Sequence, residues 1–171
     1  VNENNGTATI TVMVDRAVAG GFDVDVSTAN GTATIADGDY SAVTAQTLTF
    51  AGTASESETF TVTLGGDTKV EADETVSISM SGLSPNTVAS GDIDITDTAI
   101  LTINNDDSIN FSVNDPSVAE GNSGTTTLTF TVSLDQAAPA GGASVIYAVT
   151  SGTAVEGTDF TTIGTKTLSF L

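Results

Sequence analysis

Apolar residues alternate with threonine, serine and aspartate along most of this sequence, and no stretch has the spacing of an amphipathic helix. A period of two is typical of β-strands that bury one face. The runs with this pattern in the first part of the chain are residues 7–14, 22–26, 46–50, 59–64, 75–80 and 98–103. Because the runs are short, unequal in length and separated by glycine-containing turns, they predict an antiparallel β-sandwich with two aligned sheets rather than a closed barrel.

The chain also contains two copies of one longer pattern. Residues 1–7 recur at 118–125, 30–33 at 151–154, 38–40 at 157–160 and 47–50 at 167–170. The order and spacing agree, so we expect two tandem domains of one kind, at residues 1–107 and 108–171. The first copy lacks a counterpart of the strand at 109–113, and the second copy is incomplete because it lacks counterparts of 59–107. We therefore expect the array to continue, or another chain to supply the missing strands.

The charge balance excludes several classes of function. The chain has 3 basic and 22 acidic residues and a net charge of −19, so neither nucleic acid nor a polybasic membrane contact is expected. No apolar run is long enough for membrane insertion. Histidine is absent, which removes the usual general base and zinc ligand, and there is no tryptophan to line a carbohydrate cleft. We therefore predict that the protein is not an enzyme.

One turn carries more negative charge than a turn needs. Residues 65–74 read Gly-Gly-Asp-Thr-Lys-Val-Glu-Ala-Asp-Glu and place four carboxylates within residues 67–74. Like charges at this density repel one another unless a cation lies among them. Ca²⁺ takes six to eight oxygen ligands at about 2.3–2.6 Å, often from separate loops. We hypothesise that this turn is half of a calcium site; the alternative is a set of solvated turns, since aspartate and glycine favour turns in any case.

Five motifs in a fixed order resemble the Calx-β family. They are Glu-Asn-Asn-Gly at 3–6, Asn-Gly-Thr-Ala at 30–33, Gly-Asp-Tyr at 38–40, Val-Glu-Ala-Asp-Glu at 70–74 and Thr-Ile-Asn-Asn-Asp-Asp at 102–107. The resemblance covers all of residues 1–107 and the opening half of a repeat in 108–171. It implies an immunoglobulin-like sandwich with Ca²⁺ ions at one end. Modules of this family occur in sodium–calcium exchangers and in tandem arrays on secreted bacterial proteins.

The resemblance also implies a ligand set. In the first copy it places metal ligands on Glu3, Asp39, Asp67, Glu71, Glu74, Asn105, Asp106 and Asp107, and in the second copy on Glu120 and Asp159. Gly66 and Asn105 stand where the sensing modules carry aspartate, which implies about one to three bound ions. Asp73 is expected to be a solvated neighbour. Residues 106–107 also stand at the junction of the copies, where bound ions would stiffen the array; the alternative is a flexible acidic linker.

These observations lead to one functional expectation with two alternatives. We expect a calcium-binding structural or adhesive repeat of a secreted, extracellular cell-surface protein, with Ca²⁺ stiffening the loops and the inter-repeat junction. The scarcity of lysine and the abundance of small residues suggest a bacterial source. The expected partners are calcium ions, neighbouring repeats or other copies of the chain, and a cell-surface or matrix ligand. The alternatives are a regulatory calcium sensor of a transporter and a filament subunit assembled by strand complementation.

Overall fold

The computed structural model describes residues 1–171, which divide into two compact units. The first unit comprises Val1–Thr68 and Ala72–Asp106, and the second comprises Lys69–Glu71 and Asp107–Leu171. The two short helical segments are 3₁₀ turns, and no helix has the length and apolar character required to cross a membrane.

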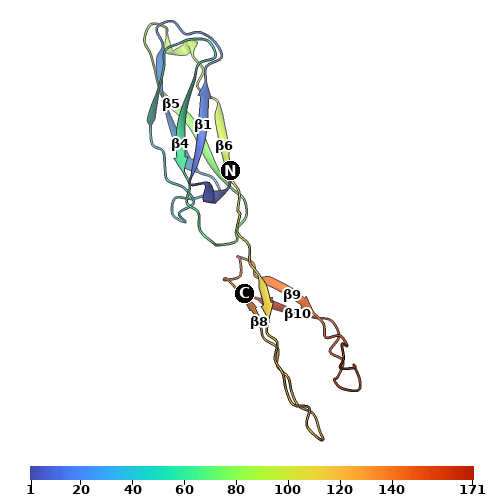
Figure 1. Ribbon diagram of the computed structural model, residues 1–171. Helices are drawn as coiled ribbons and strands as arrows, with labels where there is room; N and C mark the ends of the chain where they lie inside the picture. Colours follow the sequence, from blue (N-terminus) through green and yellow to red (C-terminus); the bar gives the residue numbers. More distant parts are fainter. The chain divides into compact units, whose positions relative to one another are not determined.

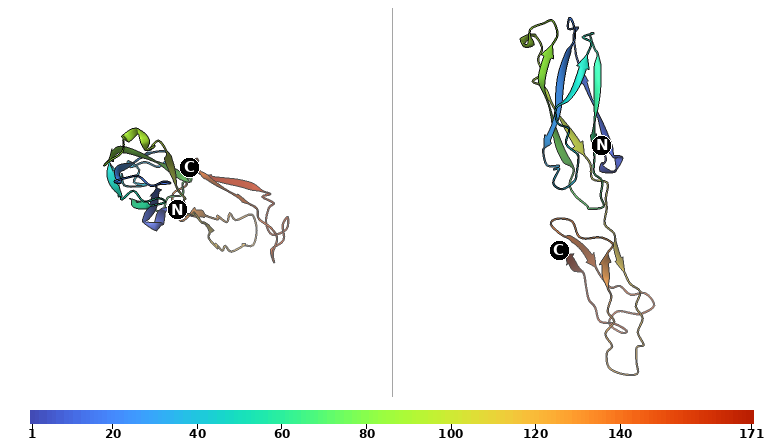
Figure 2. Two further views of the ribbon diagram at one scale, coloured as in Figure 1. Left: turned by 90° about the horizontal axis from the view of Figure 1, so that it is seen from above. Right: turned by 90° about the vertical axis from the view of Figure 1, so that its left-hand side faces the viewer.

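The first unit is a two-layered antiparallel sandwich whose strands run along a common axis (Figures 1 and 2). One layer pairs β1 with β4, and the other has the strand order β3-β2-β5-β6. The elements are η1 (Glu3–Asn5), β1 (Thr7–Met13), β2 (Phe22–Asn30), β3 (Gln46–Phe50), β4 (Ser57–Thr63), β5 (Glu74–Pro85), η2 (Ser90–Asp92) and β6 (Thr98–Ile103). This arrangement confirms the all-β antiparallel sandwich that the alternating pattern predicts, and the immunoglobulin-like form that the family resemblance implies.

The core of the first unit consists of the apolar residues that alternate along the strands. Val26, Val62 and Val76 have no exposed surface, and the rings of Phe22 and Phe50 stack with their centroids 4.8 Å apart. Each buried side chain of the size of valine or phenylalanine contributes about 1.5–3 kcal/mol to folding relative to an exposed position. Burial on one face of each strand is therefore what fixes the register of both sheets.

Two strands extend beyond the residues that the alternation marks. β2 continues from Val26 to Asn30, and β5 continues from Met80 to Pro85. The two strands pair with each other from Phe22 opposite Pro85 to Asn30 opposite Val76, with an irregularity between Asp23 and Asp25. The added residues are mostly small and polar, so backbone hydrogen bonds rather than side-chain burial hold them in the sheet. The sequence pattern could not indicate this extension.

The second unit repeats part of the first. Its strands are β7 (Phe111–Val113), β8 (Val132–Leu134), β9 (Ala143–Tyr147) and β10 (Lys166–Phe170), paired as β7–β8 and β9–β10. In β9–β10, Val145 lies opposite Leu168, as Val24 lies opposite Leu48 in β2–β3. The internal repeat is thus preserved in the strand pairing. The strand expected from residue 109 begins at Phe111, and all fully buried apolar residues of the chain belong to the first unit.

Candidate metal centre

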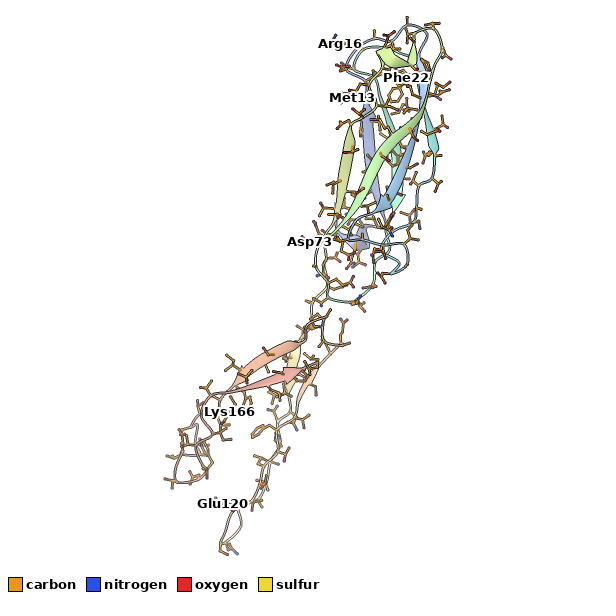
Figure 3. The ribbon with its side chains drawn as sticks, turned by 180° about the vertical axis from the view of Figure 1, so that it is seen from behind. Met13, Arg16, Phe22, Asp73, Glu120 and Lys166 are labelled. Atoms are coloured by element: carbon orange, nitrogen blue, oxygen red, sulfur yellow. The ribbon has the colours of Figure 1, made fainter.

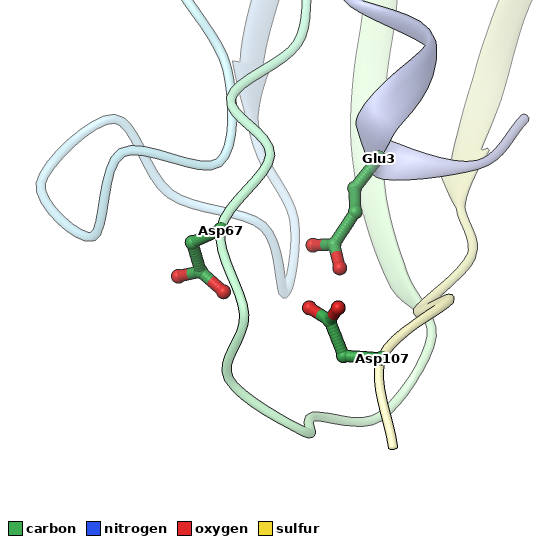
Figure 4. Close-up of side chains that lie close together, drawn as sticks. All are labelled: Glu3, Asp67 and Asp107. Atoms are coloured by element: carbon green, nitrogen blue, oxygen red, sulfur yellow. The ribbon is translucent and has the colours of Figure 1, made fainter. Parts of the chain in front are cut away.

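Acidic side chains from loops far apart in the sequence form two groups of three. In the first group, carboxylate oxygens of Glu3, Asp67 and Asp107 lie within 4.8 Å of one another (Figure 4). In the second group, those of Asp39, Glu71 and Glu74 meet the same limit. Glu3 is only 8% exposed, whereas Asp67 is exposed and the other four residues are half-buried. The structure therefore brings together six of the residues that the family resemblance suggests as ligands, in two separate groups.

Glu3 is held in place by backbone hydrogen bonds to the end of β6. The Glu3 amide donates to Asn104 O at 3.1 Å, and Asn2 forms a parallel bridge with Asn104. The Val1 ammonium donates to Thr102 O at 2.9 Å. The first residues thus run beside the last strand of the unit, which brings the carboxylate of Glu3 to the loop that follows β6.

Two glycines let the loop after β4 approach its neighbours closely. The Gly65 amide donates to Asp39 O at 2.9 Å, and a Cβ atom added at Gly65 would lie 1.9 Å from Gly38 O. A Cβ atom added at Gly66 would lie 2.2 Å from Asn4 Oδ1. Real Cβ atoms do not approach other atoms this closely, so a larger residue at Gly65 would move the loop away from the Gly38 backbone, whereas one at Gly66 would first displace the side chain of Asn4. Gly66, which the resemblance aligns with an aspartate of the sensing modules, thus lies close to the side chain of Asn4.

The loop that carries Asp39 is fixed on both sides of that residue. Asp39 Oδ2 accepts a 2.6 Å hydrogen bond from the Thr34 amide. The next residue, Tyr40, is 3% exposed, bridges to Leu64, and donates its hydroxyl to Asn30 Oδ1 at 2.7 Å. In the same group Glu74 is the first residue of β5, and Glu71 forms an ion pair with Lys69. The second group therefore draws on the hydrogen-bonded loop of Asp39, the first residue of β5 and the acidic turn that carries Glu71.

Asp106 lies outside both acidic groups, and Asn105, which has no carboxylate, is not a member of either. Asp106 Oδ1 accepts a 2.8 Å hydrogen bond from Asn4 Nδ2, and the Asn105 amide donates to Asp73 Oδ1 at 3.1 Å. Asp73 is exposed, as expected, but it also fastens the chain after β6. Sequence reasoning missed Asn4, although its position directly after Glu3 in the first motif was the signal that could have found it.

The predicted ligands of the second copy also lie outside these groups. Glu120 is exposed, unlike its counterpart Glu3. Asp159 Oδ2 accepts a 2.7 Å hydrogen bond from the Val155 amide and so repeats the bond between Asp39 and Thr34. The loop geometry around the aspartate is thus conserved between the copies, but residues 108–171 contain no counterpart of the acidic turn that would complete a group.

The donor atoms of both groups suit Ca²⁺. All are carboxylate oxygens, the ligands that hard divalent cations prefer, and the chain has no histidine or cysteine that would favour zinc. Two oxygens that bind one Ca²⁺ at about 2.3–2.6 Å can lie at most about 5 Å apart. The separations within each group meet this requirement. Glu3 Oε1 and Asp107 Oδ2 are moreover buried, where a nearby cation is screened least by water.

A two-sheet, immunoglobulin-like sandwich with acidic loops gathered at one end is typical of modules that bind cations through the loops between their strands. The chain belongs to the Calx-beta domain family, whose model matches residues 1–107 and 103–171. This membership confirms the family and the tandem arrangement that the motifs predict. No curated protein matches the chain in a sequence comparison.

Solved structures support the same fold. The crystal structure of CBD12 from CALX1.2 matches with 24% identity and a TM-score of 0.50, over 63% of this chain and 40% of that one. The crystal structure of the calcium binding domain CBD12 of CALX1.1 matches with 22% identity and a TM-score of 0.53, over 66% and 45% of the two chains. The match thus spans less than half of either relative. The predicted cofactor, Ca²⁺, agrees with the calcium binding domain among these structures.

Proposed function

We propose that this chain is a calcium-binding module that takes up Ca²⁺ through the acidic loops at one end of the sandwich. The observation that carries the proposal is the convergence of Glu3, Asp67 and Asp107, with Glu3 almost completely buried. Carboxylates held this close repel one another, and burial increases the repulsion because the effective dielectric constant falls. A divalent cation among them would turn this repulsion into attraction and join loops that are distant in sequence.

Each residue would have a definite part in binding. Glu3, Asp67 and Asp107 would hold one ion, and Asp39, Glu71 and Glu74 would hold a second. When bound, Ca²⁺ supplies a positive charge and a centre of coordination. Asn4, Asp73 and the backbone of Gly65 would keep the ligand loops in position through the hydrogen bonds described above. Binding to the folded state alone stabilises a protein, by about 2.7 kcal/mol at a hundredfold excess of ligand over Kd.

Calorimetric titration with Ca²⁺, together with thermal melts in calcium and in chelator, tests the proposal. Wild-type protein should melt at a higher temperature in calcium. The double variant Glu3→Gln, Asp67→Asn should lose most of this increase, and in chelator it should melt at or above the wild-type temperature because two repelling charges are gone. Asp92→Asn, an exposed acidic residue outside both groups, is the matched control. Equal wild-type melting temperatures in calcium and chelator would overturn the proposal.

Two finer roles are candidates, and calcium affinity separates them. A regulatory calcium module of a larger protein is supported by the likeness to the CALX calcium binding domain, and it requires a Kd of about 10⁻⁷–10⁻⁵ M. A structural or adhesive repeat of an extracellular surface protein, of bacterial origin, is supported by the two consecutive family segments and the net charge of −19. Extracellular modules bind Ca²⁺ at about 10⁻⁴–10⁻³ M. The same calorimetric titration therefore decides between the two roles, and the first has the more direct support.

We extend the proposal to the segment that connects the two repeats. Asp107 is followed by residues 108–110 and then by β7. A Ca²⁺ ion on the Asp107 carboxylate would restrict the backbone at the start of this segment. Backbone NMR relaxation of residues 106–110 should then report less motion in calcium than in chelator, and unchanged relaxation would contradict this extension.

A further inference from the structure

A pair of threonines joins the loop that carries Asp39 to the strand that begins with Glu74. The Thr75 amide donates to Thr32 Oγ1 at 2.8 Å, and the Thr32 amide donates to Thr75 Oγ1 at 3.2 Å. The Ala33 amide donates to Thr75 O at 3.0 Å. We call these hydrogen bonds the threonine clasp. They connect two segments that are 43 positions apart in the sequence.

The residues on either side of Thr32 suit a close approach to β5. A Cβ atom added at Gly31 would lie 2.5 Å from Thr75 O, so only glycine fits there without moving the backbone. Ala33 is completely buried, which anchors the other side of the clasp in the core. Thr32 itself is exposed, so burial does not account for its side chain. Its hydroxyl is used for the bonds to β5.

The loop obtains its own conformation from bonds within it. Asp39 Oδ2 accepts from the Thr34 amide, and in the second copy Asp159 Oδ2 accepts from the Val155 amide in the same way. The second copy forms this bond although Thr153, its counterpart of Thr32, makes no hydrogen bond to a neighbouring strand. The clasp is therefore not needed to shape the loop. It determines where the loop lies relative to β5.

We propose, on the basis of the calcium-binding function proposed above, that Thr32 and Thr75 position Asp39 against Glu74 and thereby set the calcium affinity of the second acidic group. Glu74 is the direct neighbour of Thr75, and Asp39 belongs to the loop that the clasp holds. A loop that had to be ordered when the ion binds would lower the affinity, because ordering costs conformational entropy. The clasp orders the loop beforehand.

The clasp and the ion must then affect each other in both directions. If the clasp raises calcium affinity by some factor, calcium favours the closed clasp by the same factor. Calcium should therefore protect the Ala33 amide from hydrogen exchange. The reference is the Val18 amide, which donates to a backbone carbonyl at 2.9 Å. Its sequence neighbours Arg16 and Phe22 lie at one end of the first unit and Asp73 lies at the other (Figure 3).

A matched pair of substitutions tests the proposal. Thr32→Val removes the hydroxyl that accepts from the Thr75 amide and keeps the size of the side chain, whereas Thr32→Ser keeps the hydroxyl. Calorimetric titration with Ca²⁺ in the Glu3→Gln, Asp67→Asn background isolates the second group. There Thr32→Val should weaken binding about tenfold, and Thr32→Ser should bind like the parent. Thr61→Val, at an exposed position of β4 outside both groups, is the control and should also bind like the parent.

A double-mutant cycle separates a positioning pair from two independent effects. Thr75→Val removes bonds of the same clasp, so its combination with Thr32→Val should weaken binding no more than either substitution alone. Additive losses would contradict the proposal. A purely structural role would lower the urea midpoint in chelator and leave the calcium affinity of the folded protein unchanged, which would contradict it as well.

The remaining outcomes distinguish this inference from the proposed function. Parent-like affinity of Thr32→Val, or equal weakening by Thr32→Ser, would overturn the inference. Hydrogen exchange of wild-type protein replaces the variants if they fail to fold, and equal gains in protection at Ala33 and Val18 would also overturn it. Wild-type protein that binds no Ca²⁺ would overturn the proposed function itself. Binding by wild type but none in the Glu3→Gln, Asp67→Asn background would overturn the inference alone, because the second group would then hold no ion.

Discussion

The side-chain amide of Asn4 donates a 2.8 Å hydrogen bond to Asp106 Oδ1, and it thereby joins two residues that are 102 positions apart. The adjacent backbone bond from Glu3 to Asn104 reinforces this connection. Together they fasten the start of the first unit to the chain that follows its last strand. Because Glu3 and Asp107 are the direct sequence neighbours of the bonded pair, this connection determines whether their carboxylates can meet.

Replacing Asn4 by alanine should therefore weaken both folding and calcium binding. The lost bond has a charged acceptor but is exposed to solvent, so we expect a decrease of about 1 kcal/mol in the free energy of unfolding, measured in urea. Calcium affinity, measured by calorimetry, should fall several-fold because the loops are less well positioned. Asn5→Ala is the matched control, since Asn5 is also exposed and lies in the same 3₁₀ turn. Equal effects of the two substitutions would contradict the role assigned to Asn4.

Gly65→Ala should displace the loop that carries Asp67. The added Cβ atom would lie 1.9 Å from the carbonyl oxygen of Gly38, and a backbone atom cannot move aside as a flexible side chain can. We expect a loss of about 1–3 kcal/mol in the free energy of unfolding, as is typical of overpacking, and a marked loss of calcium affinity. Gly91→Ala provides the control, because a Cβ atom at Gly91 has nothing within 4 Å. A Gly65→Ala protein with unchanged stability and calcium binding would show that the close approach is dispensable.

The sequence predicted the sandwich because burial on one face produces alternation, and the strands that form the core carry it clearly. It predicted β6 with its observed bounds, Thr98–Ile103, because every second residue there is apolar. It could not predict the last residues of β2 and β5, which are held by backbone pairing between polar residues. In the second unit the repeat predicted a strand at residues 109–113, of which Phe111–Val113 forms β7. Alternation predicts which residues of a strand can be buried, but it does not predict which other strand will pair with it.

For the site, the motifs indicated which acidic residues to consider, but not how they would be grouped. Whether Asp106 or Asp107 faces Glu3 depends on the direction of two neighbouring side chains, and the bond between Asn4 and Asp106 decides it. The division into two groups of three likewise follows from the path of the loop after β4, which Gly65 and Gly66 permit. These are contacts between distant segments, and no local pattern specifies them.

Tyr40→Phe should lower the free energy of unfolding only slightly, because the second copy has phenylalanine at the corresponding position. Phe160 occupies the position of Tyr40 in the second copy. The Tyr40 hydroxyl donates to Asn30 Oδ1, which also accepts a bond from the Ile35 amide, so the acceptor keeps one partner after the substitution. We expect a loss of about 1 kcal/mol in urea unfolding, the usual value for one neutral hydrogen bond. Tyr40→Ala, which empties a buried position, should cost about 3–5 kcal/mol.

Glu56 should make the stability of the first unit depend on pH. Its carboxylate accepts hydrogen bonds from the amides of Ala51, Gly52 and Thr53 and from the Thr53 hydroxyl, at 2.8–3.3 Å. These hydrogen bonds, that from the Ala51 amide first among them, lower the pKa of Glu56 in the folded state. The stabilisation is therefore fully present above the pKa of the unfolded chain, and it disappears as the pH falls through the lower pKa of the folded state.

Glu56→Gln should consequently be less stable than wild type at neutral pH, and the difference should shrink as the pH falls below about 4.3, the ordinary pKa of glutamate. Urea unfolding of both proteins across this range, in chelator, measures the difference. Glu58→Gln, two residues further on in β4, is the control, because the four hydrogen bonds of Glu56 have no counterpart there. If the gap between Glu56→Gln and wild type stayed constant with pH, the carboxylate charge would not be the source of the stabilisation, and the loop at 51–53 would owe its conformation to other contacts.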